Sequence, residues 1–336
     1  MALSLAKTAL FGILTAGLAV DACPTAAKRT GTCTSINQRK AWHNLTNDEK
    51  TSFINAELCI MNSPTRSGWI PGAKNLWDEL HYTHIYQGNY MHYVGHFLPW
   101  HRWFVRTHEI LLQECGYEGG HPYWDEPYDL ANAPLNESSI FDPVYGFGGN
   151  GAGGGGGCIE DGPFANVTLH INKTSTEANY CISRNLNQDD LDQANTTNIA
   201  ECMAYSNYTT AWECWNGYPH GAGHGAVGGL MSDPIESNGD PTFFLHHAWL
   251  DKMWAEWQTA WGNNYSDIGG PNVPPEYIIE SSGLGFPSAS ILDYNGDGPD
   301  NHTSLNHVLW MDNIVDNVTI ADVMELGGST ICAEYI

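Results

Sequence analysis

The sequence predicts a mainly α fold, a helical bundle with long loops and little strand. Helix-start signals precede several segments whose composition and spacing favour helix. Between them lie a Pro- and Asn-rich stretch at 122–143 and the glycine run GFGGNGAGGGGG at 146–157, both typical of loops. The chain of 336 residues can bury a sizeable core, and its 13 tryptophans favour a well-packed globular protein.

Five helices are expected in chain order. Thr46 and Glu49 have capping-box spacing and open the first, after a stretch at 35–45 that also has helical character. Gly95 and Pro99 interrupt the chain before the third, and short strand-like runs such as VLWM (308–311) occur only near the end. The expected helices span residues 46–61, 75–91, 100–114, 221–231 and 241–261.

The N-terminus has the pattern of a secretory leader. Lys7 precedes the apolar run at 9–20, which is too short for a membrane span, and Lys28–Arg29 forms a dibasic processing site. We therefore expect a signal peptide with a short propeptide at 1–29 and a single domain at 30–336; an uncleaved N-terminal helix is the alternative. The glycine run is interpreted as a surface loop within that domain, although a linker between two domains would have the same composition.

Charge and cysteine usage agree with secretion. The net charge of −25 and pI of about 4.7 argue against nucleic-acid or anionic-membrane partners. Loss of Cys23 with the leader leaves eight cysteines, an even number expected to pair as disulfides. Nine N-glycosylation sequons predict a glycoprotein with N-linked glycans. They begin at Asn44, Asn136, Asn166, Asn172, Asn195, Asn207, Asn264, Asn301 and Asn317.

Two histidine-rich windows predict a metal centre. Six of the 15 histidines lie within 81–108, and four more lie in PHGAGHGAVGG (219–229) and DPTFFLHHAWLDKMW (240–254). Neutral imidazole is the commonest metal ligand, so two windows suggest two ions. His220 and His224, at i and i+4, can share one ion with a member of the pair His246–His247. There is no H-E-x-x-H motif for a zinc protease, and ligation by histidine alone suits copper.

The same windows resemble a known family. HFLPWHRWF (96–104) and DPTFFLHHAWLDKMWAEW (240–257) resemble the two copper motifs of tyrosinases and catechol oxidases, and PYWD (122–125) resembles a further segment of that family. With the opening TCTSINQRKAWHNL, the resemblance covers nearly all of 30–336 and is greatest to short secreted polyphenol oxidases of ascomycete fungi. It implies a dinuclear type-3 copper centre as cofactor.

The resemblance also implies the ligands. It gives three histidines to each copper ion, with His246 as a neighbour of the sixth ligand. His81 stays open as an alternative first ligand, and His96 is expected to pack or hydrogen-bond beside the site. The implied ligands are His84, His92 and His101 for one ion and His220, His224 and His247 for the other.

The implied activity is oxidation of o-diphenols to o-quinones with O2, with o-aminophenols as a further candidate substrate class. A tyrosinase that also hydroxylates monophenols is the alternative, and an oxygen carrier of the hemocyanin type is a remote one. Many tyrosinases have an Asn directly after the first ligand of the second site, thought to hold a water; here Gly221 and Gly225 follow His220 and His224. Glu213, seven residues before His220, is the candidate to orient such a water, as an acidic residue does in relatives; an ordinary surface carboxylate is the alternative.

Overall fold

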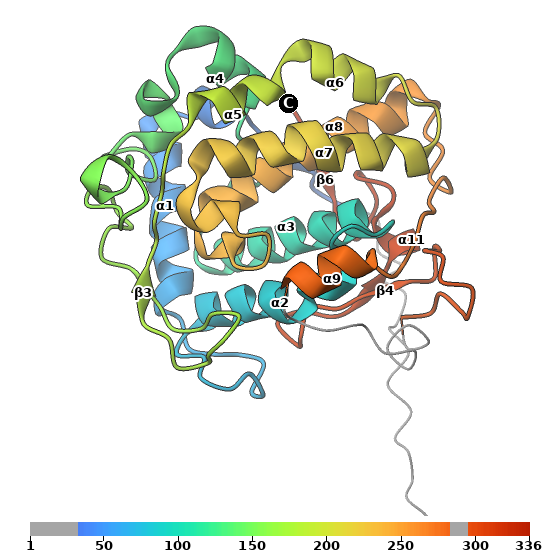
Figure 1. Cartoon of the computed structure of the whole chain (residues 1–336), viewed down its shortest axis with the longest axis horizontal. Coiled ribbons are helices and arrows are strands. Elements are labelled where there is room, and N and C mark those ends of the chain that lie inside the picture. The colour runs from blue at the N-terminus through green and yellow to red at the C-terminus, as the bar shows by residue number, and fades with distance from the viewer. Residues whose placement is uncertain (1–32, 283–294) are drawn as a thin grey trace, which may run out of the picture.

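The computed structural model describes residues 33–282 and 295–336 and confirms a mainly α fold (Figure 1). The expected leader and Cys23 lie outside the described residues. Within the described part, no helix has both the length and the apolar character needed to cross a membrane. The α-helices are α1 (Asn47–Asn62), α2 (Leu76–Met91), α3 (Phe97–Glu114), α4 (Glu126–Asn132), α5 (Gln188–Leu191), α6 (Thr196–Met203), α7 (Tyr208–Val227), α8 (Thr242–Ala260), α9 (Glu276–Ser282) and α11 (Ile320–Val323).

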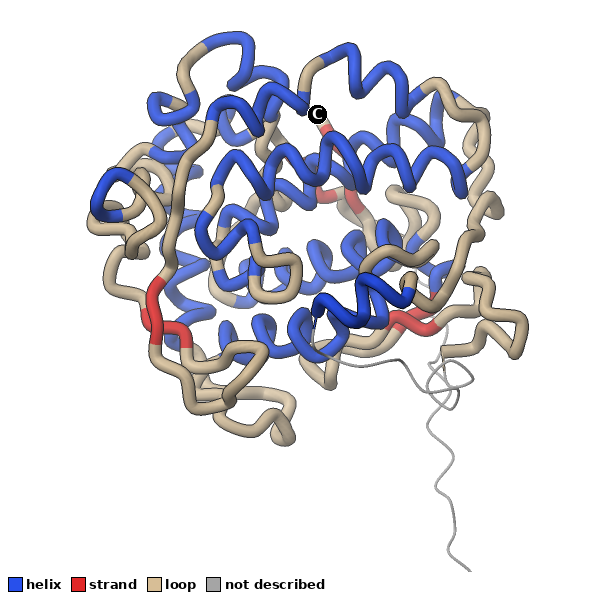
Figure 2. The backbone as a smooth tube through the Cα atoms, viewed as in Figure 1, coloured by secondary structure: helices blue, strands red, loops and turns tan. Residues whose placement is uncertain are grey.

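The strands are short, and long loops join the helices (Figure 2). β1 pairs in parallel with β6, whereas β2 with β3 and β4 with β5 pair antiparallel. β4 falls in the predicted strand-like run. The strands are β1 (Asn37–Arg39), β2 (Thr168–Leu169), β3 (Tyr180–Cys181), β4 (Val308–Leu309), β5 (Val318–Thr319) and β6 (Ala333–Tyr335).

Local sequence explains where the histidine-bearing helices begin and end. Thr46 forms the predicted capping box with Glu49, and Asn75 caps α2 by accepting a hydrogen bond from the Asp78 amide. α3 begins at Phe97, earlier than expected. Pro99 does not interrupt it, because a proline in the first helical turn lacks only an amide that has no partner there.

Three other expectations about helices were incomplete or wrong. Residues 35–45 form strand β1 and a short 3-10 helix at Trp42–Asn44, because the backbone there pairs with β6 and with Tyr123. α7 begins at Tyr208, capped by Asn207, well before the predicted 221. The short helices α4, α5 and α6 were not predicted, since they are four to eight residues long and lack a full apolar period.

One apolar core contains residues from both sides of the glycine run, from Ala41 to Ala333. α3 packs against α8, α8 against α7, and α1 against α2 and α3 (Figure 1). Arg39 of β1 binds Glu109 of α3 at 3.0 Å and Asp251 of α8 at 3.1 Å, all fully buried, and Arg102 also contacts Asp251. This network joins the N-terminal strand to the two central helices.

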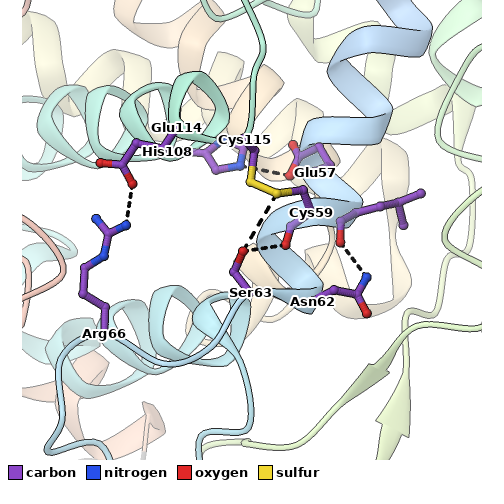
Figure 3. The surroundings of a disulfide bond; sticks show 9 residues. Glu57, Cys59, Asn62, Ser63, Arg66, His108, Glu114 and Cys115 are labelled. Atoms are coloured by element: carbon purple, nitrogen blue, oxygen red, sulfur yellow. Dashed lines mark hydrogen bonds and ion pairs between the residues drawn. A yellow bond between two sulfur atoms is a disulfide. The ribbon is translucent and has the colours of Figure 1, made fainter.

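Eight cysteines form four disulfides, as the even number predicted. The pairs are Cys33–Cys332, Cys59–Cys115, Cys158–Cys181 and Cys202–Cys214. Cys59–Cys115 joins α1 to the C-terminal end of α3, close to a buried pair in which Glu57 Oε2 lies 3.0 Å from His108 Nε2 (Figure 3). The disulfide and the Glu57–His108 pair fix α1 against one of the histidine-bearing helices.

Candidate metal centre

The structure brings together the three histidines expected for the first ion. His84 lies on α2, His92 directly follows that helix, and His101 lies on α3. One ring nitrogen from each lies within 4.8 Å of the others, and all three residues are buried. The sharp connection between α2 and α3, where Tyr93 has a φ of 56°, allows His92 to face both helices.

A second group contains the three histidines expected for the other ion and one more. His220 and His224 project from one face of α7, one turn apart, as their spacing predicted. The pair His246–His247 faces them from α8, and one nitrogen from each of the four lies within 4.8 Å of the others. His220 is half-buried, so this group has an open side.

The two groups face each other. The rings of His101 and His247 stack with centroids 4.2 Å apart. Phe97 packs beside both groups, 4.5 Å from His101 and 4.8 Å from His220, and Phe243 lies 4.9 Å from His84 and 4.1 Å from His247. The two histidine groups are therefore in direct contact and flanked by aromatic rings, an arrangement that fits one dinuclear site.

Backbone carbonyls orient five of the six predicted ligands. A carbonyl oxygen only accepts, so each of these rings carries its proton on Nδ1 and leaves an Nε2 lone pair for a metal. The His92 ring donates to the Gly88 carbonyl, which lies in the last turn of α2, where carbonyl groups have no amide donor within the helix. The Nδ1 donors are His84 to Ile235 (2.8 Å), His92 to Gly88 (3.1 Å), His101 to Phe97 (2.8 Å), His220 to Asn216 (3.4 Å) and His224 to Met231 (2.7 Å).

Several of the opposite ring nitrogens lack protein partners. Nε2 of His84, His101, His220 and His246 is buried without a hydrogen bond, and Nε2 of His224 and His247 lie 3.3 Å from each other. A buried polar atom without a partner is costly, so several converging on one space indicate an absent ligand. A metal bound by imidazole would satisfy these lone pairs, and the donor set therefore fits copper.

Burial also keeps the rings neutral. Desolvation lowers the pKa of His92 to about 3 and that of His224 to about 4. Desolvation, reinforced by the neighbouring imidazoles, lowers the pKa of the other four predicted ligands well below the usual value. Neutral imidazole is the form that binds a metal.

His81, the alternative first ligand, and His96, expected beside the site, both lie outside the two groups. His81 has both ring nitrogens engaged, Nδ1 2.8 Å from Asn238 Oδ1 and Nε2 2.7 Å from the Tyr180 hydroxyl, which leaves none for a metal. His96 directly precedes α3, stacks on His307 with ring centroids 3.8 Å apart and contacts the Tyr90 carbonyl. His96 therefore packs beside the site, as expected.

Glu213 lies on α7 two turns before His220, and its side chain is exposed. Seven residues of helix separate their Cα atoms by about 10 Å. Among the described residues, its carboxylate has no hydrogen bond to a histidine of either group. A role for Glu213 in the reaction stays a prediction.

A buried carboxylate beside the second group was missed. Glu126, the first residue of α4, has Oε1 2.5 Å from His246 Nδ1. The only sequence signal was its position directly after PYWD, the segment that resembles the family. Sequence spacing could not show that Glu126 meets a residue 120 positions later.

Comparison with known sequences identifies the family. Residues 74–260, more than half of the chain, match the common central domain of tyrosinase. A tyrosinase-like protein of Diaporthe leptostromiformis, phomQ1', is 30% identical over 326 residues, covering 90% of this chain and 80% of the relative. The tyrosinase ustQ of Aspergillus flavus is 30% identical over 321 residues, with the same coverage.

Comparison with solved structures agrees. A polyphenol oxidase variant from Thermothelomyces thermophila superposes with a TM-score of 0.74 at 28% identity, covering 90% of this chain and 89% of the other. Its family implies a dinuclear copper centre, and the paired histidine groups described above fit one. The chain belongs to the tyrosinase family and is a fungal tyrosinase-like type-3 copper protein.

Proposed function

We propose that the chain is a catechol oxidase whose two copper ions are held by the six predicted histidines. The observation that carries this proposal is the facing pair of groups with buried, unpartnered ring nitrogens. The proposed ligands are His84, His92 and His101 for one ion and His220, His224 and His247 for the other. When bound, the copper pair supplies electron transfer from the phenol to O2.

The reaction balances without a further reductant. Each o-diphenol gives up two electrons and two protons and becomes an o-quinone. Two diphenols together supply the four electrons and four protons that convert one O2 into two waters. The chain's own residues hold the rings neutral and directed, and Phe97 and Phe243 pack against them and exclude water.

The substrate is proposed to enter on the side of His220. His220 and His224 are the partly exposed members of the second group, and Gly221, directly after His220, is exposed. A Cβ at Gly221 would meet no atom within 4 Å, so there is room at this point for a phenol ring.

Gly221 also favours diphenol oxidation over monophenol hydroxylation. Hydroxylation requires removal of the phenol's proton by a base within about 3 Å, directly or through one water. Gly221 and Gly225 have no side chain to hold that water, and Glu213 can act only through further waters. An o-diphenol ionises more readily near the metals, so it depends less on such a base.

Oxygen uptake on copper-loaded protein tests this proposal. We expect rapid uptake with an o-diphenol, slower uptake with an o-aminophenol, and slow or lagging uptake with a monophenol. Equal initial rates on tyrosine and catechol would indicate a tyrosinase with hydroxylase activity. Reversible O2 binding without consumption of a diphenol would indicate an oxygen carrier.

We also propose that the protein is secreted and carries N-linked glycans. Four disulfides need an oxidising compartment, and none of the nine sequon asparagines is buried. Mass spectrometry of secreted protein, before and after removal of N-glycans, should show a processed N-terminus and a decrease in mass. An unprocessed N-terminus with no such decrease would contradict this proposal.

A further inference from the structure

The carboxyl group of Glu126 is buried beside the second histidine group, and its one hydrogen-bond partner among the described residues is His246. Its second oxygen, Oε2, has no hydrogen bond, and the nearby charges on Asp125 and Asp129 are of the same sign. No Lys or Arg of the described chain pairs with it. Burial, with Asp129 and Asp125 nearby, raises the pKa of Glu126 well above its usual value, and burial lowers the pKa of His246. The contact is therefore a hydrogen bond between neutral groups, and its loss would leave buried polar atoms without a partner.

Glu126 is held firmly against α8. The Trp124 amide donates to the Leu245 carbonyl at 3.0 Å, and the Trp124 indole donates to Asp129 at 2.7 Å. These bonds fix the segment before α4 directly opposite His246. The Glu126–His246 contact is therefore formed between two anchored backbones.

α7 has a glycine where the Glu126–His246 pair reaches it. Gly223 lies between His220 and His224, and a Cβ there would lie 2.2 Å from His246 Nδ1 and 2.4 Å from Glu126 Oε1. No side chain fits at this distance. Gly223 thus lets the pair lie directly on the helix that carries two predicted ligands.

His247 is the predicted ligand that lacks a carbonyl anchor. Its Nδ1 has no partner, unlike Nδ1 of the other five. His246 lies against it, with ring centroids 5.0 Å apart and the planes at 77°, and lies against His224 in the same way at 4.9 Å. The anchored His246 ring therefore borders both His224 and His247.

We propose that Glu126 is a positioning residue for the second histidine group, acting through His246. Glu126 holds the His246 ring against α7 at Gly223, and that ring keeps His247 turned toward His101. The inference rests on the proposed function, since it assumes that the second group binds copper. It goes beyond that function because it assigns to the second group a supporting side-chain contact, whereas backbone carbonyls hold the rings of the first group.

Two substitutions test whether the hydrogen bond from Glu126 to His246 supports the second group. Glu126→Leu removes the anchor while filling the space, and we expect a chelator to remove one copper about tenfold faster than from wild type, the lower end of what outer contacts cost. Glu126→Gln keeps a group able to hydrogen-bond to Nδ1 and should stay within about twofold of wild type. Copper content per chain and EPR report the result, because a lone Cu(II) gives a signal whereas a coupled pair is silent.

Glu57→Leu is the matched control. Glu57 is also fully buried and also bonds a histidine, His108, but neither residue belongs to a histidine group. We expect this variant to lose stability and yet to keep both copper ions and a silent EPR spectrum. Gly223→Ala, which alters neither partner, should lose one copper selectively as Glu126→Leu does.

Three outcomes decide the inference. Selective loss of one copper in Glu126→Leu and Gly223→Ala, but not in Glu57→Leu, supports it. Two copper ions retained at the wild-type rate in folded Glu126→Leu would overturn it and leave the proposed function intact. Wild-type protein that binds no copper would refute both; if Glu126→Leu does not fold, Gly223→Ala decides in its place.

Discussion

The two histidine groups differ in how their rings are held. In the first group, all three residues are buried and each ring donates Nδ1–H to a backbone carbonyl. In the second, His220 is half-exposed and His247 has no such anchor. α7 also places glycines at 221, 223 and 225 around its two histidines.

The two groups are therefore expected to have different roles within one site. Rings anchored to regular backbone and removed from solvent form a rigid group that no substrate can enter directly. The second group has an open side and is supported by side chains, so a substitution can change it without unfolding the core. We therefore expect copper retention to depend on both groups, and substrate choice to depend on the second.

Removal of one ligand from either group should have the largest effect. His101→Ala and His224→Ala each leave a site with an incomplete ligand set. We expect each to lower diphenol oxidation more than about a hundredfold, beyond the loss that outer contacts cause. Copper content and oxygen uptake measure the result.

His43→Ala is the control for these variants. His43 stacks on Tyr128 at 3.6 Å and belongs to neither group. It should retain both copper ions and wild-type activity. Full activity in either ligand variant would show that the groups do not form the centre.

The histidine motifs predicted much of the site, because spacing within one helix translates directly into geometry. His220 and His224 share a face as their i, i+4 spacing requires, and the two windows meet as expected of a single centre. The capping box of α1 likewise depends on residues three positions apart.

Contacts between distant segments could not be predicted in the same way. Glu126 meets His246 only because Trp124 binds α8, and Arg39 meets Asp251 across 212 positions. The strand β1 forms because β6 provides a partner from the other end of the chain. Such pairings follow from tertiary packing, which overrides local helical character.

Gly221→Asn tests whether the open side sets substrate preference. A side chain at 221 has room, and its amide could hold a water beside His220. We expect the monophenol-to-diphenol rate ratio to rise by up to about tenfold, as an added positioned proton acceptor would allow. Oxygen uptake on tyrosine and on catechol gives the ratio.

Gly217→Asn provides the control, since it lies one turn earlier on α7 and is equally unobstructed. It carries the same helix propensity but lies a full turn before Gly221, so its amide cannot take the position directly after His220 and should leave the ratio unchanged. An unchanged monophenol-to-diphenol rate ratio in Gly221→Asn would mean that Gly221 does not determine substrate preference.

Glu57→Gln should change the pH dependence of stability and leave the copper site intact. Burial raises the pKa of Glu57 well above its usual range and lowers that of His108 to about 3. Because the folded-state pKa of Glu57 is raised, this residue makes its full contribution to the free energy of unfolding below about pH 4.3. That contribution decreases as pH rises. The neutral His108 contributes above about pH 6.5 and loses its contribution as pH falls.

Because Gln does not ionise, Glu57→Gln lacks the decrease at higher pH. Its stability relative to wild type should therefore rise between about pH 4.3 and the folded-state pKa of Glu57, by at most about 1.4 kcal/mol per pH unit. Urea unfolding at several pH values measures this difference. A difference that falls with pH would mean that Glu57 is ionised and His108 protonated.

Glu213→Gln should have the smallest effect. The exposed carboxylate is about 10 Å along α7 from His220, farther than one bridging water allows for proton transfer. We expect less than about a threefold decrease in monophenol hydroxylation and no change in diphenol oxidation, because an exposed charge two turns away is largely screened by solvent. A tenfold or larger loss confined to monophenols would instead show that a chain of waters links Glu213 to the open side of the second group.

A double variant that combines Glu213→Gln with Gly221→Asn sharpens the test. If the new amide holds a water that Glu213 orients, Glu213→Gln should reduce the gain from Gly221→Asn, whereas independent sites would give additive effects.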